Sequence, residues 1–559
     1  MVIKKQEIGK RAAETTTAFN PVVGAQFSEL IKSAATVAGQ ATRNPLTVGR
    51  HTLGFLQNAA AIVRGKSDLS PNPRDRRFTD PTWSSNRFYR QTLQFWMAAR
   101  ASVTKCIEDF ELERTDRART ALLVDIVMDT LAPTNSLLGN PAAVKRFYET
   151  GGRSLLRGLR NAWDDFISGN SLPAQVDSRN FEVGNNLACT EGSVVFRDDM
   201  LEVIQYAPQT EKVRAIPLLI IPPQINKFYV LDLTPEKSLI RYLVGQGFQV
   251  FCISWFNPGP AQENWDLEAY VRSVIKATDV TLDITRQKKL NVMGACSGGI
   301  TVSTAMSHLA AIGDKRVKSL TLQVCLLDPK PDDTELGALM SDASVEFARN
   351  KSAKKGILSG KELAKTFAWM RPNDLIWNYF VNNYLMGDSP PAFDVLHWNN
   401  DSTNLAAAVH SDFLDFFVDS PLAHPGTVEF MGHPLDLSKV KQDIFISSGL
   451  TDHITPWRAC YRSVGLFGGD VTFVVSTSGH IQSLINPPGN PKARYLTSSV
   501  ETDDTTEWMK HAEEHTGSWW SMWSEWLDGR SGAMRNAPGQ PGNAEYPPLD
   551  KAPGLYVFG

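Results

Sequence analysis

Apolar segments separated by stretches with helical spacing predict a buried parallel β-sheet beyond residue 190. Strands buried on both faces lack the alternation of half-exposed strands, and these segments fit that pattern. They lie at 215–221, 249–254, 290–293, 320–327, 441–449 and 471–476. Two further segments, 193–197 and 201–206, predict an antiparallel pair at the entry to the sheet. The pattern therefore predicts an α/β fold, a doubly wound sheet with intervening helices.

Residues 1–190 differ, because apolar residues recur there at helical spacing. The clearest stripe consists of Leu53, Leu56, Ala60 and Val63. We predict a mainly helical N-terminal domain over 1–190 and a catalytic domain over 191–559. The first 100 residues hold 15 Lys and Arg against 6 Asp and Glu. Such a basic amphipathic region either lies on an anionic interface or packs on its own protein, and the sequence leaves both possibilities open.

A strand that runs through a glycine-bracketed cysteine into a helix is predicted at 288–300. Gly294 and Gly298 flank Cys296 in the pattern Gly-x-Cys-x-Gly. In the related Gly-x-Ser-x-Gly elbow, the central residue is a nucleophile on a strained turn and the next amide donates to an oxyanion. Most free cysteines are small buried core residues, but the bracketing glycines favour a nucleophile here.

A thiol at this position suits the transfer of an activated acyl group. Attack of a thiolate on a coenzyme A thioester exchanges one thioester for another, so that the step is nearly isoenergetic and reversible. A serine would form a more stable oxoester instead. The residue type therefore favours an enzyme that holds an acyl group and passes it on.

An acid and a base follow in chain order, each just after a predicted strand. Asp452 is the candidate acid and His480 the candidate base. The order nucleophile, acid, histidine is that of the α/β-hydrolase fold. Two alternatives stay open: Asp328, at the end of an earlier strand, as the acid, and His453, beside Asp452, as the base.

Between about 330 and 435 the alternation of strands and helices stops. This insertion precedes the acid loop, where an α/β-hydrolase carries its cap. Aromatic residues are dense within it, notably at 367–380 and 393–398. They either form an ordinary helical core or line a path for an acyl chain or a subunit contact.

Composition narrows the class of protein. The chain has 559 residues, 42% of them hydrophobic and 21% charged, which suffices for a large core and more than one domain. Its six cysteines lack paired spacing and its histidines lack metal-ligand spacing, so we predict no disulfide framework, no metal site and no cofactor. The sequence shows no secretory or membrane-spanning apolar run, which predicts a cytoplasmic protein. The acidic excess beyond residue 100 argues against nucleic-acid binding.

Five segments together resemble the polyhydroxyalkanoate synthases. They lie at 222–233, 294–299, 371–379, 452–457 and 478–483. The length, the helical start at 140–143 and the proline-rich stretch 486–491 are similar to class II members, which favour medium-chain monomers and need no second subunit type. The stretch 325–333 is more polar and proline-rich than the family pattern, which leaves the preferred side-chain length open.

The resemblance implies an α/β-hydrolase fold with a cap, and polymerisation of (R)-3-hydroxyacyl-CoA into polyhydroxyalkanoate with release of coenzyme A. Cys296 would carry the growing polyester chain as a thioester, and His480 would move the proton. Asp452 would orient His480 or help to deprotonate the substrate hydroxyl. The backbone amides of Ser297 and Ile225 are the oxyanion-hole candidates. The resemblance also implies a homodimer at the surface of polymer granules, in contact with granule-associated proteins.

Two other functions fit the same motifs. One is a cysteine-dependent thioesterase of the same fold, and the other is a granule-coating protein without activity. A synthase and a hydrolase both need an elbow, a base and an acid, so the exclusion of water distinguishes them.

Overall fold

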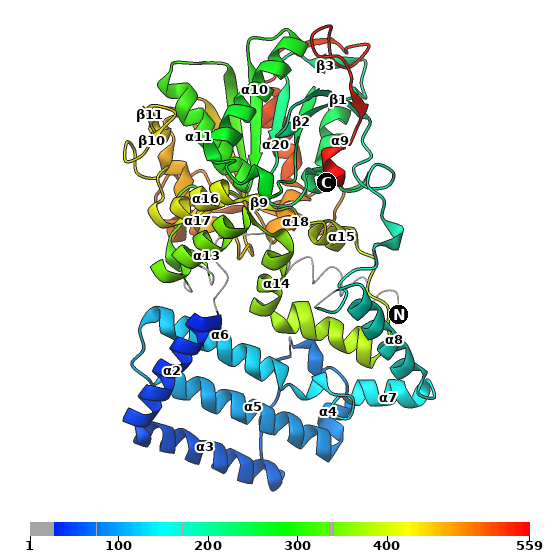
Figure 1. Cartoon of the computed structure of the whole chain (residues 1–559), viewed down its shortest axis with the longest axis vertical. Helices are drawn as coiled ribbons and strands as arrows, with labels where there is room; N and C mark the ends of the chain where they lie inside the picture. The colour runs from blue at the N-terminus through cyan, green and yellow to red at the C-terminus, as the bar shows by residue number, and fades with distance from the viewer. Residues whose placement is uncertain (1–26, 74, 170–171, 335–336, 338–339) are drawn as a thin grey trace.

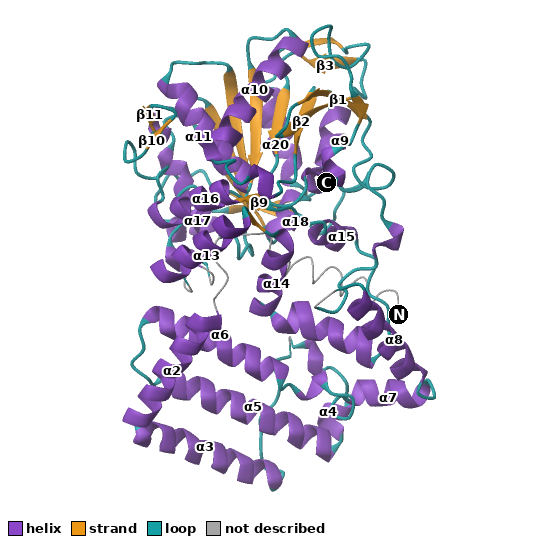
Figure 2. Ribbon diagram, viewed as in Figure 1, coloured by secondary structure: helices purple, strands orange, loops and turns teal. Residues whose placement is uncertain are grey.

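The centre of the fold is a mixed β-sheet, drawn in orange in Figure 2. The computed structural model describes residues 27–559 except 74, 170–171, 335–336 and 338–339. In this part of the chain the sheet has 11 strands in the order β15-β14-β13-β12-β7-β6-β4-β5-β2-β1-β17. Their bounds are β1 Gly192–Arg197, β2 Leu201–Tyr206, β4 Leu218–Ile221, β5 Val250–Trp255, β6 Leu290–Ala295, β7 Val317–Gln323, β12 Asp443–Gly449, β13 Val471–Ser476, β14 Arg494–Thr497, β15 Glu513–Thr516 and β17 Asp550–Lys551.

The six central strands from β5 to β13 pair in parallel, while the outer strands on both sides pair antiparallel. Strands β4 and β6 are buried along their whole length, as expected of strands with apolar residues on both faces. Gly294 on β6 pairs with Ile221 on β4 and with Leu322 on β7. This register aligns the carboxyl ends of the central strands at one edge, where the candidate site residues follow.

Helices cover both faces of the sheet. On one face α10 (Leu267–Thr285) and α11 (Ser297–Ala311) pack over the central strands in a large apolar cluster. On the other face α9 (Leu239–Gly245) and α20 (Trp519–Asp528) form a second cluster, which contains the buried Trp519, Trp520 and Trp523. The predicted doubly wound arrangement is confirmed, and the α/β-hydrolase fold with it.

Helices fill the chain before the first strand, as predicted, and Figure 1 shows them gathered at the end of the molecule away from the sheet. They are α2 Phe27–Arg43, α3 Pro45–Val63, α4 Thr82–Ser85, α5 Arg87–Glu108, α6 Arg114–Thr130, α7 Pro141–Glu149 and α8 Arg153–Ile167. The predicted start of α7 is present, because the Asn140 side chain accepts from the Ala142 and Ala143 amides. The domain boundary near residue 190 stays a prediction, and residues 1–26 lie outside the described part.

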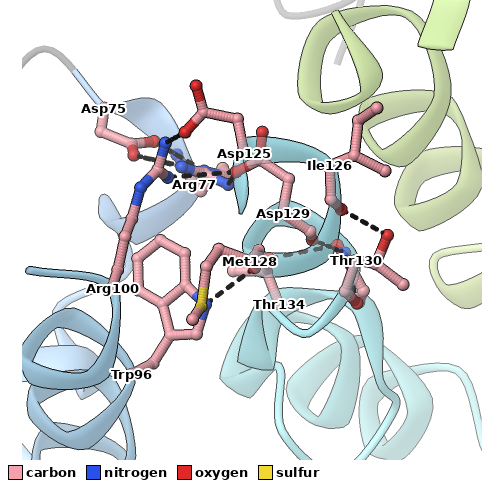
Figure 3. Close-up of polar contacts among 11 residues, drawn as sticks. Asp75, Arg77, Trp96, Arg100, Asp125, Ile126, Met128, Asp129, Thr130 and Thr134 are labelled. Carbon is pink, nitrogen blue, oxygen red and sulfur yellow. Dashed lines mark hydrogen bonds and ion pairs between the residues drawn. The ribbon is translucent and has the colours of Figure 1, made fainter. Parts of the chain in front are cut away.

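A network of charges holds these helices together. Arg77 and Arg100 converge on the Asp129 carboxylate at 3.0 and 3.2 Å (Figure 3). The guanidinium carbons of both arginines lie over the ring of Trp96, at 5.3 and 5.6 Å from its centroid. The Trp96 indole donates to the Met128 carbonyl at 2.9 Å. The network thereby ties the segment before α4 and helix α5 to the end of α6.

The apolar stripe predicted on α3 faces solvent. Leu53, Leu56 and Val63 are each more than half exposed. The sequence left open whether this stripe packs on its own protein or lies on an anionic interface. Packing on the described part of the protein is wrong for these three residues.

Helices also make up the insertion between β7 and β12, apart from two-residue strands. They comprise α13 Asp342–Lys355, α14 Gly360–Met370, the π-helical segments η7 Asn373–Trp377 and η8 Phe380–Leu385, α15 Asp394–Asn400 and α16 Ala407–Asp419. Figure 1 shows α13, α14 and α15 between the sheet and the N-terminal helices. We call residues 330–435 the cap. In the described residues, every helix is too short or too polar to cross a membrane.

Candidate active site

Cys296 lies on a sharp turn between β6 and α11. Its backbone has φ 49° and ψ −122°, which is a strained conformation for a residue with a side chain. The Cys296 amide donates to the Gln323 carbonyl at the end of β7, at 2.9 Å. The predicted elbow is therefore present, and its strained residue is the cysteine.

Glycines around Cys296 let three backbone segments approach closely. A Cβ atom at Gly294 would lie 2.6 Å from Val302 Cγ1 and 2.7 Å from Gly299 Cα. A Cβ atom at Gly298 would lie 2.5 Å from the Pro222 carbonyl oxygen, in the loop after β4. Gly294 is thus required by the close packing of β6 on α11, and Gly298 by the contact of the elbow with the loop after β4.

Replacing Gly298 by alanine is expected to lower the free energy of unfolding by about 1–3 kcal/mol, because backbone rather than a flexible side chain opposes the new methyl group. Thermal melting measures this effect. Gly465→Ala is the matched control, since a Cβ atom there meets nothing within 4 Å. Equal melting temperatures of the two variants would contradict the packing argument.

Asp452 and His480 meet at the carboxyl ends of β12 and β13. Asp452 Oδ2 lies 2.7 Å from His480 Nδ1, and both side chains are buried. Gly449, at the end of β12, permits this approach because a Cβ atom there would lie 2.7 Å from the Ser478 carbonyl oxygen. His480 begins the short helix α18 (His480–Leu484). The structure thus brings together the acid and the base predicted from the sequence.

The electrostatics of the three side chains are coupled. Burial alone would lower the pKa of His480, but the Asp452 carboxylate, together with the hydrogen bond and charge of Cys296, raises it to about 10. Burial alone would raise the pKa of Asp452, but His480 and hydrogen bonds from Thr455 lower it. The imidazole is therefore charged at neutral pH. With Nδ1 on Asp452, its Nε2 is the nitrogen left to interact with the Cys296 side chain.

Thr455 belongs to this group and was missed from the sequence. Its hydroxyl donates to Asp452 Oδ2 at 2.7 Å and lies 3.1 Å from His480 Nδ1. Asp452 Oδ1 accepts from the Ile454 and Thr455 amides at 2.9 and 3.0 Å. The signal available in the sequence was the Asp-x-x-Thr spacing, which is typical of an aspartate that accepts hydrogen bonds from the turn after it.

Thr455→Val should lower the turnover number about tenfold, because it removes the hydroxyl that helps to fix both Asp452 and His480. Thr455→Ser keeps the hydroxyl and should restore most of the activity. The pH dependence of turnover distinguishes positioning from packing, since the loss of one donor to Asp452 shifts the profile. A Val variant with the wild-type rate and profile would show that the hydroxyl has no role.

The two oxyanion-hole candidates, Ser297 and Ile225, lie on adjoining segments. Ser297 is the first residue of α11, so its amide has no partner within the helix. Its hydroxyl accepts from the Gln224 amide at 3.2 Å and thereby joins the loop after β4 to the elbow. Among the described residues, the Ile225 amide has no acceptor, whereas the Asn226 amide donates to Thr403. Both candidate amides thus lack an acceptor among the described residues, on segments that the Gln224–Ser297 hydrogen bond joins.

The cap holds the loop that carries Ile225. Thr403 Oγ1 accepts from the Asn226 amide at 2.8 Å and donates to the Gln224 carbonyl at 2.9 Å. Asp401 pairs with the Lys227 ammonium at 2.8 Å. The end of α15 and the residues after it therefore clamp the loop from the cap side.

The alternative acid and base are placed differently. Asp328 pairs with Arg462, whose Nε lies 3.0 Å from its carboxylate. His453 is largely buried, and its Nε2 has no hydrogen-bond partner among the described residues. Burial and the charge of Arg371 lower the pKa of His453 to about 4, so it is neutral. Neither residue takes part in the Asp452–His480 pair.

The other cysteines differ from Cys296 in their surroundings. Burial raises the pKa of Cys252, Cys325 and Cys460 well above the usual value, which keeps these thiols protonated. In the part of the chain that the structure describes, no three His, Cys, Asp or Glu side chains cluster as metal ligands would.

Known proteins match both parts of the chain. The model of the poly-beta-hydroxybutyrate polymerase (PhaC) N-terminus matches residues 74–243, and that of the alpha/beta hydrolase fold matches 217–487. Poly(3-hydroxyalkanoate) polymerase 1 of Ectopseudomonas oleovorans is 48% identical over 551 residues, which cover 99% of this chain and 98% of the relative. The chain belongs to the poly(3-hydroxyalkanoate) polymerases. The resemblance found in the sequence is thereby confirmed, and the polymerase is an acyltransferase.

Two further relatives extend the comparison. Poly(3-hydroxyalkanoate) polymerase 2 of Ectopseudomonas oleovorans is 48% identical over 540 residues, which cover 96% of each chain. The poly(3-hydroxyalkanoate) polymerase subunit PhaC of Cupriavidus necator is 39% identical over 504 residues, which cover 89% of this polymerase and 85% of the relative.

Proposed function

We propose that the polymerase builds its polyester from (R)-3-hydroxyacyl-CoA through a covalent thioester on Cys296. The observation that carries this proposal is the convergence of three groups: a cysteine on a strained elbow, the His480 imidazole that interacts with it, and the Asp452 carboxylate 2.7 Å from the same imidazole. The arrangement matches the needs of nucleophilic acyl transfer.

The loading step begins with a Cys296 thiolate beside a charged His480. The sulfur attacks the thioester carbonyl carbon, and the resulting oxyanion accepts from the amides of Ser297 and Ile225. One such donor contributes on the order of 3 kcal/mol to the transition state. When the tetrahedral intermediate collapses, the bond to the coenzyme A sulfur breaks. That sulfur takes the proton of His480, which leaves an acyl-cysteine, a neutral imidazole and free coenzyme A.

Chain extension then uses the neutral imidazole as the base. The 3-hydroxyl oxygen of a second hydroxyacyl unit attacks the thioester carbonyl of the acyl group held on Cys296. The proton of this hydroxyl passes to His480, and Cys296 leaves as a thiolate. Of the two roles considered for Asp452, orientation of His480 fits the contacts better. Both oxygens of Asp452 are already occupied by hydrogen bonds from Ile454, Thr455 and His480.

The class II preference for medium-chain monomers is part of this proposal. Its support is the higher identity to the two Ectopseudomonas oleovorans polymerases, at 48%, than to the Cupriavidus necator subunit, at 39%. We place the polymerase in the cytoplasm at the surface of its polymer. The homodimer stays a prediction.

Incubation with (R)-3-hydroxyacyl-CoA of graded acyl length tests the function. Free thiol measures coenzyme A release, and the mass of the acyl product shows what is formed. We expect insoluble polymer, with the fastest release for medium chains. Free hydroxy acid as the main product would identify a thioesterase. If no substrate released free thiol, the remaining function would be that of a granule-coating protein without activity.

A further inference from the structure

Helix α8 presents its small and polar side chains to the rest of the protein. Ser154, Gly158 and Asp165 are buried against the cap. A Cβ atom at Gly158 would collide with the Tyr384 carbonyl of η8, so the two backbones are in direct contact. The Asn161 amide donates to two backbone carbonyls in and after η8, at 2.9 and 3.0 Å. The contact face of α8 is therefore the opposite of the apolar face with which a helix normally packs.

Large apolar side chains occupy the solvent face of the same helix. They leave between 60% and 73% of their surface exposed and comprise Leu156, Leu159, Trp163, Phe166 and Ile167. Successive members of this set are three, four, three and one residues apart, which places them on a single stripe of the helix. The rings of Trp163 and Phe166 stack with centroids 5.8 Å apart. Proteins that work as free monomers rarely leave a continuous patch of this kind in water.

Positive charge borders the stripe. Arg153, Arg157 and Arg160 are exposed on α8, and Asp164, 3.8 Å from Arg160, is the one exposed acidic side chain of this helix. Figure 1 shows α8 beside α7 at the edge of the molecule, and Figure 2 shows the same placement. The stripe is thus an exposed apolar face with a basic flank.

We propose that α8 binds the polymerase to an anionic lipid surface. An amphipathic helix with Trp, Phe and Leu on one side and arginines beside them lies in the plane of such a surface, with the apolar side chains among the acyl chains and the cations at the headgroups. An uncharged surface could cover the apolar stripe, but it carries no negative charge to pair with the arginines. A second copy of α8 packed on this face would place its three arginines near the three arginines of the first copy, and the like charges would repel.

Vesicle sedimentation of the full chain tests the proposal. We expect binding to vesicles of phosphatidylcholine with phosphatidylglycerol, and binding at least about tenfold weaker to phosphatidylcholine alone. The double variant Trp163→Ser/Phe166→Ser should bind anionic vesicles about tenfold more weakly or less. Arg157→Gln/Arg160→Gln should lose the preference for anionic vesicles. Phe347→Ser, at a half-exposed aromatic residue of α13, is the matched control and should bind as the wild type.

Three results would overturn the proposal: equal binding to neutral and anionic vesicles, no binding to either, or unchanged binding of the Trp163/Phe166 variant. Light scattering provides a fourth such result. If the Trp163→Ser/Phe166→Ser variant had half the molar mass of the wild type, the apolar stripe would be a contact between two copies of the chain. Circular dichroism checks that the variants fold. The sedimentation needs no acyl substrate, so its failure leaves the proposed chemistry standing, and failure of that chemistry leaves lipid binding standing.

Discussion

Cys296→Ala is expected to lower coenzyme A release from (R)-3-hydroxyacyl-CoA by at least about 10³-fold, because the proposed mechanism has no other nucleophile. The buried Cys325 and Cys460 thiols cannot replace it, since burial raises their pKa values well above the usual range. Release of free thiol over time measures the effect. Mass spectrometry of the wild type after a short reaction should show the acyl group on the peptide that contains Cys296.

Cys189→Ala is the matched control for this prediction. Cys189 is half-buried and precedes β1, which lies toward the opposite edge of the sheet from β13, and burial raises the pKa of Cys189. Its loss should leave the rate within about twofold of the wild type. Substantial activity in Cys296→Ala, or an acyl group on a different cysteine, would refute the assignment of the nucleophile.

Asp452→Asn is expected to lower turnover by about 10³–10⁴-fold while the protein stays folded. Burial lowers the pKa of His480 and the Asp452 carboxylate raises it, so without the carboxylate the pKa falls toward or below its ordinary value of about 6.5. The imidazole then loses its charge near neutral pH. Cys296 thereby loses a charged neighbour between about pH 6.5 and 10, where the wild-type imidazole keeps its proton, and the alkylation of Cys296 should slow most in this range.

The rate of alkylation of Cys296 by iodoacetamide across this pH range measures the change. Thr451→Val, at an exposed neighbour on the same loop, serves as the control and should keep the wild-type profile. An unchanged pH profile in Asp452→Asn would show that the carboxylate does not set the charge of His480.

The sequence predicted the sheet and the three central side chains because each follows from a local pattern. An elbow needs small residues on both sides of its central residue, so Gly294 and Gly298 predict Cys296 as the candidate nucleophile without knowledge of any distant contact. Buried parallel strands need continuous apolar residues, and the two loops after β12 and β13 could be found by their position alone.

Other features depend on contacts between distant parts of the chain and could not be predicted. Thr403 meets Gln224 and Asn226, which are more than 170 residues away in the sequence. The inward face of α8 could not be predicted from its sequence, because it is fixed by the contact of Gly158 with the distant Tyr384 backbone and by hydrogen bonds of Asn161 to carbonyls in and after η8. For α3, the apolar spacing was visible, but its exposure to solvent was not.

The hydroxyl of Thr403 has a mechanical consequence. It joins the cap to both residues that flank Ile225, so a displacement of the cap that admits a bulky acyl group also disturbs the amide expected to stabilise the oxyanion. An open polymerase would then be a poor catalyst at the moment when water has freest access to the acyl-cysteine that we propose. Entry of substrate and cleavage of the thioester would be separated in time, which would protect the chain on Cys296 from premature hydrolysis.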